Sequence, residues 1–366
     1  MNFHSNRLPF NRRQMLALAG AGLVTTVMPG RVRAQEEGDP VYFTWAGYDN
    51  PIFFQPYIDK NGSSPEVSFF VDEDEATLKL RSGFIADVGH PCASGLTLWR
   101  DAGLLRPIDR SRLEHWDEIF PTIRAIPGIE DEDGVWLVPF DWGNSALIIR
   151  TDLVDEADRG SLADILLNPK YKGRISLPDI SIESAAIGGL LAGIDDPFNM
   201  SEDDIAVWRE TMKQANENVL FYWSDPTTME QSLVSGEIVA AWGWNFSVTS
   251  VAANGTPVAY LTELQGGAMT WVCGLSLLSS TEAHNDKAYD LLNAFSSAES
   301  GKNLIEQYGF GAANQKSFEI ADPAAVQALG FSDAQAFIDS GLFFSAMPGE
   351  LRQRISVELE QIKAGQ

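Results

Sequence analysis

Short apolar runs alternate with polar segments of helical character along most of the chain. The runs are bounded mainly by glycine, proline or asparagine, which is typical of strands in the interior of a sheet. The predicted strands cover residues 41–45, 66–71, 86–88, 135–140, 145–150, 175–177, 219–223, 238–241 and 271–279. Strands that alternate with helices form βαβ units and a parallel sheet, so we predict an α/β fold.

The alternation occurs twice, which divides the chain into two lobes. The segment Asp141-Trp142-Gly143-Asn144 lies between two predicted strands. We interpret this glycine beside an aromatic residue as a point where the chain crosses from one lobe to the other. After Trp271 the chain returns to the first lobe. The first lobe is predicted to contain residues 35–143 and 271–317, and the second residues 144–270 and 318–366.

The helices are predicted from apolar residues at helical spacing and from their capping residues. They cover residues 51–60, 72–81, 95–101, 162–167, 185–192, 203–216, 229–233, 286–297, 301–308, 324–329, 333–338 and 350–363. Residues 107–134 are rich in proline and acids and are predicted to form a surface excursion.

Tryptophans gather at the ends of two predicted strands. Trp242 and Trp244 end the run that begins at Ile238, and Trp271 begins the next strand. The carboxyl ends of strands in an open α/β sheet form the ligand crevice. The pattern therefore predicts a cleft lined by aromatic rings, with tryptophans of an ordinary core as the alternative.

The first 34 residues have the layout of an export signal. Arg12 and Arg13 precede the apolar run Met15 to Met28, which is too short to span a bilayer, and small residues before Gln35 form a cleavage site. The arginine pair resembles a twin-arginine signal. We therefore expect a periplasmic protein.

Charge and composition exclude several classes of partner. The formal net charge is −25, and it becomes −30 once the five arginines of residues 1–34 are removed. Such a field repels nucleic acid and anionic membrane surfaces. It attracts cationic small molecules, although an acidic surface also serves solubility.

No catalytic or metal-binding motif is found, so we expect neither an enzyme nor a cofactor. Three histidines follow the signal, His90, His115 and His284, and none has metal-ligand spacing. His90 lies close to Cys92, but neighbours on a strand end are not oriented for proton transfer. Cys92 and Cys273 are the two cysteines; in an export compartment they form either a disulfide or two buried thiols.

The order and spacing of several motifs resemble one family of transport proteins. The chain is similar to periplasmic solute-binding proteins of ABC importers, in the spermidine/putrescine-binding branch. The motifs are Trp45-Ala-Gly-Tyr48, Gly103-Leu-Leu-Arg-Pro-Ile-Asp109, Val138-Pro-Phe-Asp-Trp142-Gly143, Leu162-Ala-Asp-Ile165, Pro169-Lys-Tyr-Lys-Gly173, Gly236-Glu-Ile-Val239, Trp244-Asn245, Gly255-Thr-Pro257 and Gly266-Gly267 before Trp271.

The resemblance implies a fold, a site and partners. The fold is the two-lobed type II fold with a hinge and a ligand cleft between the lobes. The partners are a small cationic or zwitterionic amine, a membrane permease and its ATPase, and the protein is expected to be a monomer. Aromatic rings and carboxylates hold the amine, and the matching residues here are Trp45, Tyr48, Glu183, Trp244 and Trp271.

The chain departs from the family at five positions. Ile180 and Cys273 stand where the family has acids, Ser94 and Phe310 where it has tyrosines, and Ser345 near a glutamine. Ser94 and Phe310 remain candidate ligand residues. The same comparison places Cys92 beside Cys273, which implies a disulfide at the floor of the cleft.

With one matched acid left, we hypothesise a smaller amine than a polyamine, such as a quaternary ammonium compound or an amino-acid-like solute. A polyamine proper is the alternative, and it requires Asp141 or Asp225 as a further charge partner. A ligand-binding sensory protein of the same fold fits the sequence equally well.

Overall fold

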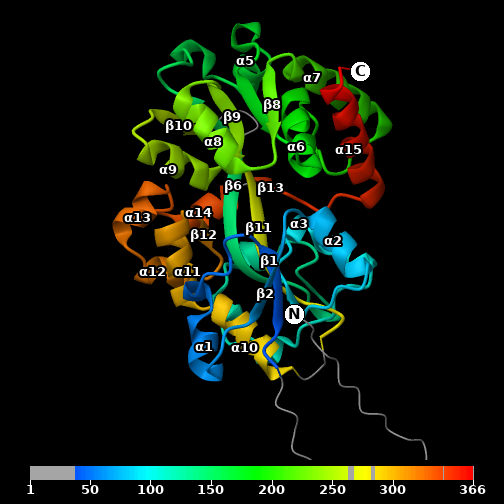
Figure 1. The fold of residues 1–366 in the computed structure, drawn as a ribbon, viewed down its shortest axis with the longest axis vertical. Coiled ribbons are helices and arrows are strands. Elements are labelled where there is room, and N and C mark those ends of the chain that lie inside the picture. Colours follow the sequence, from blue (N-terminus) through cyan, green and yellow to red (C-terminus); the bar gives the residue numbers. More distant parts are fainter. Residues whose placement is uncertain (1–37, 263–267, 282–284, 341, 366) are drawn as a thin grey trace, which may run out of the picture. The chain divides into compact units, whose positions relative to one another are not determined.

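The computed structural model describes residues 38–262, 268–281, 285–340 and 342–365 (Figure 1). The predicted export signal, residues 1–34, lies outside the described residues, as do Gly266, Gly267 and His284. Residues 38–366 belong to one unit, which is described by itself. Within the described ranges, every helix is too short or too polar to cross a membrane.

One twisted sheet connects most strands, in the order β2-β1-β3-β11-β6-β9-β7-β8. The strands of this path are β1 (Val41–Trp45), β2 (Glu66–Phe70), β3 (Val88–Gly89), β6 (Val138–Arg150), β7 (Ile175–Pro178), β8 (Val219–Trp223), β9 (Ala240–Trp244) and β11 (Met269–Leu277). The first three strands are parallel to one another, as are β7, β8 and β9. The predicted parallel α/β arrangement is confirmed for these two groups, whereas β6 and β11 run antiparallel to their neighbours in this order.

Three short strands complete this sheet, and two more form a hairpin. β10 (Val258–Leu261) and β12 (Gly311–Ala312) pair with β6, and β13 (Leu342–Phe343) pairs with β11. The hairpin contains β4 (Glu130–Asp131) and β5 (Gly134–Val135).

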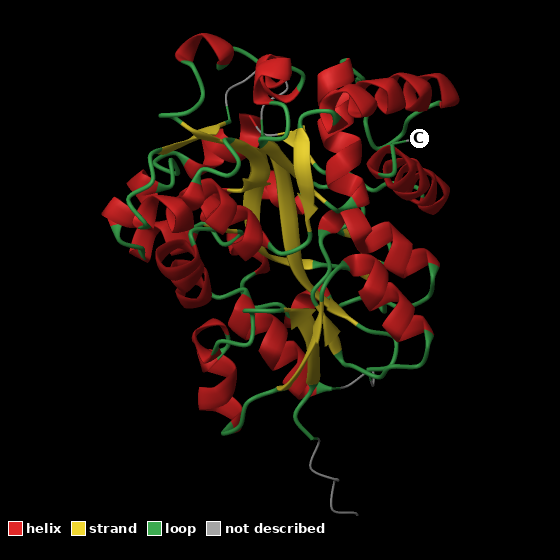
Figure 2. Ribbon diagram, turned by 45° about the horizontal axis from the view of Figure 1, so that its top comes forward, coloured by secondary structure: helices red, strands yellow, loops and turns green. Residues whose placement is uncertain are grey.

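Helices pack on both sides of the strands, as Figure 2 shows. The α-helices are α1 (Gln55–Asn61), α2 (Glu73–Arg81), α3 (Ala93–Asp101), α4 (Pro121–Arg124), α5 (Leu162–Leu166), α6 (Ser181–Ala192), α7 (Glu202–Asn216), α8 (Pro226–Ser235), α9 (Asn245–Ala253), α10 (Asp286–Phe295), α11 (Ala298–Asn303), α12 (Lys316–Ile320), α13 (Pro323–Ala328), α14 (Ala334–Ser340) and α15 (Gly349–Lys363). Helix α9, which follows Trp244 directly, was not predicted.

Residues 141–144 were predicted to lie between two separate strands. This is wrong, because they lie within one continuous strand, β6. Gly143 pairs with Trp271 of β11. A Cβ atom at Gly143 would lie 2.3 Å from Cζ2 of Trp271. The glycine therefore permits a close approach of the indole to the strand and does not interrupt the strand.

Two main groups of buried apolar residues flank this stretch of β6. The first core contains Trp142 and Val272, and the second core contains Leu147 and Met269. β6 and β11 thus pass from one core into the other. Phe331 and Ile338 belong to the first core. We therefore propose that the first lobe extends to about residue 343, beyond the predicted boundary at residue 317.

Residues 107–134 are not a surface excursion. Leu113, Trp116, Ile119, Phe120 and Ile123 are buried in the first core. Phe120 also donates its backbone N–H to the carbonyl of Ala313 at 3.0 Å. The acids of this segment lie in short helices, in β4 and in turns, while the apolar residues between them face the core.

Cys92 and Cys273 form the disulfide that the family resemblance implied. The bond joins the residue before α3 to the middle of β11. Beside it, Glu73 of α2 accepts a hydrogen bond from the backbone N–H of Cys92 at 2.8 Å. Arg352 of α15 lies 4.0 Å from the same carboxylate.

Substituting Gly95 with alanine should destabilise the protein. An added Cβ would lie 2.4 Å from both carboxylate oxygens of Glu73, which is buried. We expect a loss of about 1–3 kcal/mol in the free energy of unfolding, the range seen for overpacking. Urea unfolding measures it.

Gly349→Ala is the matched control, because Gly349 also lies in the first turn of a helix and nothing lies within 4 Å of its added Cβ. This variant should be at least as stable as the unmodified protein, since alanine favours helix over glycine. Equal stability of the Gly95→Ala variant would contradict the steric argument.

Candidate ligand-binding site

Glu183 is a buried carboxylate in the first turn of α6. Its oxygens accept three hydrogen bonds: from Ser145 Oγ at 2.7 Å, Trp242 Nε1 at 2.8 Å and Trp244 Nε1 at 3.2 Å. All three donors are neutral. They orient the carboxylate without cancelling its charge.

Burial raises the pKa of Glu183, while the hydrogen bonds from Ser145, Trp242 and Trp244 act in the opposite direction. Among the described residues, no lysine, arginine or histidine forms an ion pair with it. A buried charge without a counter-charge is costly. A cation that entered beside Glu183 would remove this cost.

Four rings, which we call the aromatic group, lie together near the same strand ends: Trp244, Phe246, Trp271 and Phe310. Trp244 stacks on Phe246 with centroids 6.4 Å apart, Phe246 contacts Phe310 edge-on at 5.7 Å, and Phe310 contacts Trp271 edge-on at 5.0 Å. The rings come from β9, α9, β11 and the residue before β12. Trp244 links the group to Glu183 through its indole N–H.

Trp45 and Tyr48 make their contacts elsewhere. The indole N–H of Trp45 donates to the carbonyl of His90 at 2.8 Å, and its ring contacts Phe70. The hydroxyl of Tyr48 donates to Asp141 at 2.5 Å. The ligand-binding role of both residues stays a prediction.

The two other predicted acids are used inside the protein. Asp141 is 1% exposed and lies 3.1 Å from Nε2 of His90, in addition to its bond from Tyr48. Asp225 caps α8 by accepting from the backbone N–H groups of Thr227 and Thr228. Asp141 lies beside a histidine and Asp225 is exposed to solvent, so neither is a buried carboxylate with neutral neighbours alone, as Glu183 is.

The other predicted position, Ser94, lies buried in the first turn of α3, beside the disulfide. The sequence analysis missed Phe246 and Ser145. The signal for Phe246 was its place directly after the predicted Trp244-Asn245 motif. Ser145 had no signal, because its contact with Glu183 joins the middle of β6 to the first turn of α6, 38 residues away in sequence.

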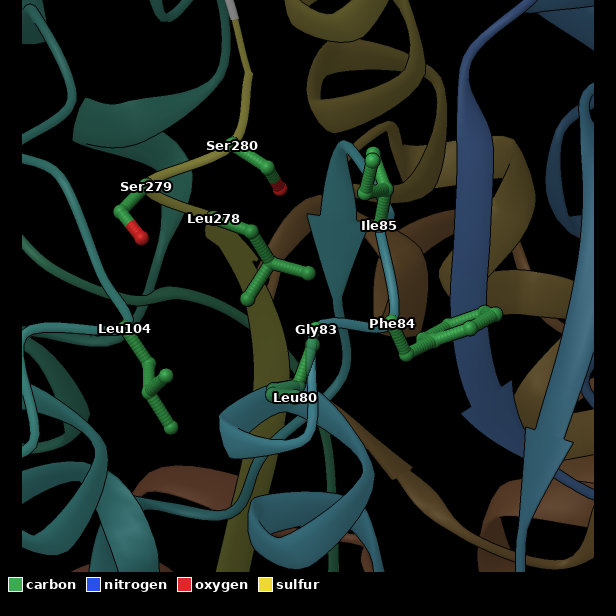
Figure 3. A pocket seen from close by; sticks show the side chains of 8 residues that line it. All are labelled: Leu80, Gly83, Phe84, Ile85, Leu104, Leu278, Ser279 and Ser280. Atoms are coloured by element: carbon green, nitrogen blue, oxygen red, sulfur yellow. The ribbon is translucent and has the colours of Figure 1, made fainter.

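A separate surface pocket lies at the far end of β11, where side chains from the end of α2 and the following loop meet those after β11 (Figure 3). It is lined by Leu80, Gly83, Phe84, Ile85, Leu104, Leu278, Ser279 and Ser280. None of these side chains is charged, so this pocket lacks the means to select a cation.

The chain is similar in sequence to known solute-binding proteins. The family model of bacterial extracellular solute-binding proteins matches residues 76–330. The spermidine/putrescine-binding periplasmic protein of Escherichia coli is 23% identical over 308 residues, which cover 84% of this chain and 86% of that relative.

Two solved structures share the fold. One is the spermidine/putrescine ABC transporter substrate-binding protein PotD from Streptococcus pneumoniae, with a TM-score of 0.73, 16% identity, and coverage of 90% of this chain and 99% of that chain. The other is the PBP MotA from A. tumefaciens in complex with glucopine, with a TM-score of 0.70, 17% identity, and coverage of 89% and 100%. The predicted fold of the periplasmic binding proteins is therefore confirmed.

The raised pKa of Glu183 should show in the pH dependence of stability. The folded protein holds a proton on Glu183 at pH values where the unfolded chain has released it. The free energy of unfolding should therefore rise, relative to that of the Glu183→Gln variant, as the pH falls through the raised pKa. Chemical denaturation of both proteins over the acidic range measures this, and parallel profiles would refute it.

Proposed function

We propose that this chain, which belongs to the family of bacterial extracellular solute-binding proteins, captures a small amine for import by an ABC transporter. Glu183 pairs with the positive charge of the amine, and the aromatic group surrounds its apolar part. A cation over an aromatic ring gains roughly 0.5–2 kcal/mol, and the charge-assisted contact with the carboxylate adds to this.

The observation that carries the proposal is the unpaired charge of Glu183. Four acidic side chains are buried in the part of the chain that the structure describes. Two of them pair with arginines, Glu73 with Arg352 and Glu358 with Arg209 and Arg354, and the third, Asp141, accepts a hydrogen bond from Tyr48 and lies 3.1 Å from Nε2 of His90. Among the described residues Glu183 has neutral donors alone, which supports a ligand as the source of its counter-charge.

A single unpaired acid favours an amine with one positive charge. A second ammonium group buried in the same cleft would lack a partner, which costs several kcal/mol. Quaternary ammonium compounds and amino-acid-like zwitterions carry one positive charge. We infer that compounds of this size are the ligands.

A polyamine is the second candidate. It is favoured by the relative from Escherichia coli, which is named for binding spermidine and putrescine. A second ammonium group of a polyamine would need another carboxylate. Asp141 would have to give up its contacts with Tyr48 and His90 for this, or Asp225 would have to stop capping α8.

The partners follow from the family. The amine-loaded protein, a monomer exported to the periplasm by the twin-arginine route, delivers its ligand to a membrane permease that an ATPase drives. A sensory protein of the same fold would deliver the signal to a receptor in place of a permease.

A thermal-shift screen tests the ligand class. Residues 35–366 are screened against putrescine, spermidine, choline, betaines, basic amino acids and opine-like compounds. A compound that binds only the folded state raises the melting temperature by mass action. We expect shifts from singly charged amines; shifts from polyamines alone would favour the second candidate.

Glu183→Gln keeps the shape of the side chain and removes its charge, and it should abolish the shift. Glu217→Gln is the control, because that carboxylate is 71% exposed and lies 3.9 Å from Lys172 in a weak pair. Unchanged affinity of the Glu183→Gln variant would contradict the proposal.

A further inference from the structure

Asn245 lies between two members of the aromatic group, Trp244 and Phe246, at the first position of α9. Its side chain is partly buried. The carboxamide has one acceptor oxygen and an NH₂ donor. Both are used, and each bonds to a different segment of the chain.

The oxygen faces the strand that passes between the cores. Asn245 Oδ1 accepts from the backbone N–H of Asn144 at 3.1 Å. Asn144 follows Gly143, which pairs with Trp271. A Cβ atom at Gly143 would lie 2.6 Å from Asn245 Oδ1 as well as 2.3 Å from the indole of Trp271. The amide of Asn245 and the indole of Trp271 thus both pack against the backbone of Gly143, which has no side chain.

The NH₂ group of Asn245 bonds to the segment that precedes Phe310. Asn245 Nδ2 donates to the carbonyl of Gly309 at 2.5 Å. Gly309 has φ +69°, a left-handed conformation that turns the chain after residues 304–308, and it directly precedes Phe310. The position of this carbonyl is therefore tied to the position of the Phe310 ring.

The two bonds connect elements of different cores. Val251 of α9 is buried with Ile148 and Trp223 in a third apolar cluster, whereas Leu304 and Phe310 belong to the first core. Asn245 therefore joins the part of the aromatic group on β9 and α9 to the part beside β12. Phe246 also packs against the first core and contacts Phe310 directly, so the bonds of the amide add to this contact between the two parts.

We propose that Asn245 is a positioning residue for amine binding, which holds the aromatic group at the separation that fits the charged end of the ligand. The inference rests on the proposed function. Asn245 acts through the rings and through Gly309, and Glu183 remains the group that pairs with the charge.

Two variants test the proposal, with choline and putrescine as the probes in calorimetric and stopped-flow titrations. Asn245→Leu removes both hydrogen bonds at similar volume. Asn245→Asp keeps the acceptor for Asn144 and turns an oxygen toward the Gly309 carbonyl. We expect about tenfold weaker binding in both, as for the loss of a hydrogen bond, and mainly through faster dissociation.

The aspartate variant separates positioning from charge. A negative charge added beside a cation should strengthen binding by Coulomb attraction. Weaker binding by Asn245→Asp is therefore the result that positioning requires, and tighter binding would overturn the proposal.

Asn254 supplies the matched control. It follows the same helix, and its Nδ2 donates to the carbonyl of Ser250 at 3.0 Å within that helix. Asn254→Leu and Asn254→Asp should bind the probes as the unmodified protein does. The melting temperatures of all ligand-free variants are compared, so that a general loss of stability is recognised.

The outcomes distinguish the two proposals. If the unmodified protein binds no amine of the panel, the proposed function falls and this inference falls with it. If the protein binds an amine and the Asn245 variants bind it equally well, the inference alone is overturned.

Discussion

The pairing of β6 with β11 is the constraint on which the rest of the structure depends. Both strands are long, and both contribute residues to the first and the second core. At the crossing, Gly143 faces Trp271 so closely that any side chain would collide with the indole. In the same stretch of β6, the backbone N–H of Asn144 donates to Asn245 and the side-chain hydroxyl of Ser145 donates to Glu183. The candidate site is thus assembled along three consecutive residues of one strand.

Two buried acids on either side of this crossing have different partners. Asp141 accepts a hydrogen bond from Tyr48 and lies against His90, so its two oxygens make their contacts inside the protein. Glu183 accepts from a serine and two indoles, none of which carries charge. Both carboxylates are almost fully buried, so exposure does not distinguish them. The chemistry of their neighbours does, and it is the reason why we propose Glu183, and not Asp141, as the partner of a ligand.

The sequence predicted those features that depend on local pattern. Strand β1 has the predicted bounds. Phe310, which lies in one group with Trp244 and Trp271, was named through the family resemblance and not from local pattern. Helix α9 was missed because Asn245-Phe-Ser-Val-Thr-Ser250 contains β-branched and polar residues with weak helix propensity. It is helical because burial of Ser247 and Val251 against neighbouring elements overrides propensity. The contacts of Trp45 and Tyr48 depend on tertiary packing, which the pattern of one chain does not contain.

The large negative charge and the single unpaired acid act over different distances. A net charge of −25 attracts any cation toward the surface, but salt screens this attraction within about 8–10 Å. Most surface carboxylates are hydrated, and their ion pairs contribute little energy. Under the proposed function, selection among amines therefore occurs at the buried Glu183 and the aromatic group. A ligand with one charge would balance one carboxylate, and the rings, in the positions that we propose Asn245 maintains, would limit which apolar groups fit beside it.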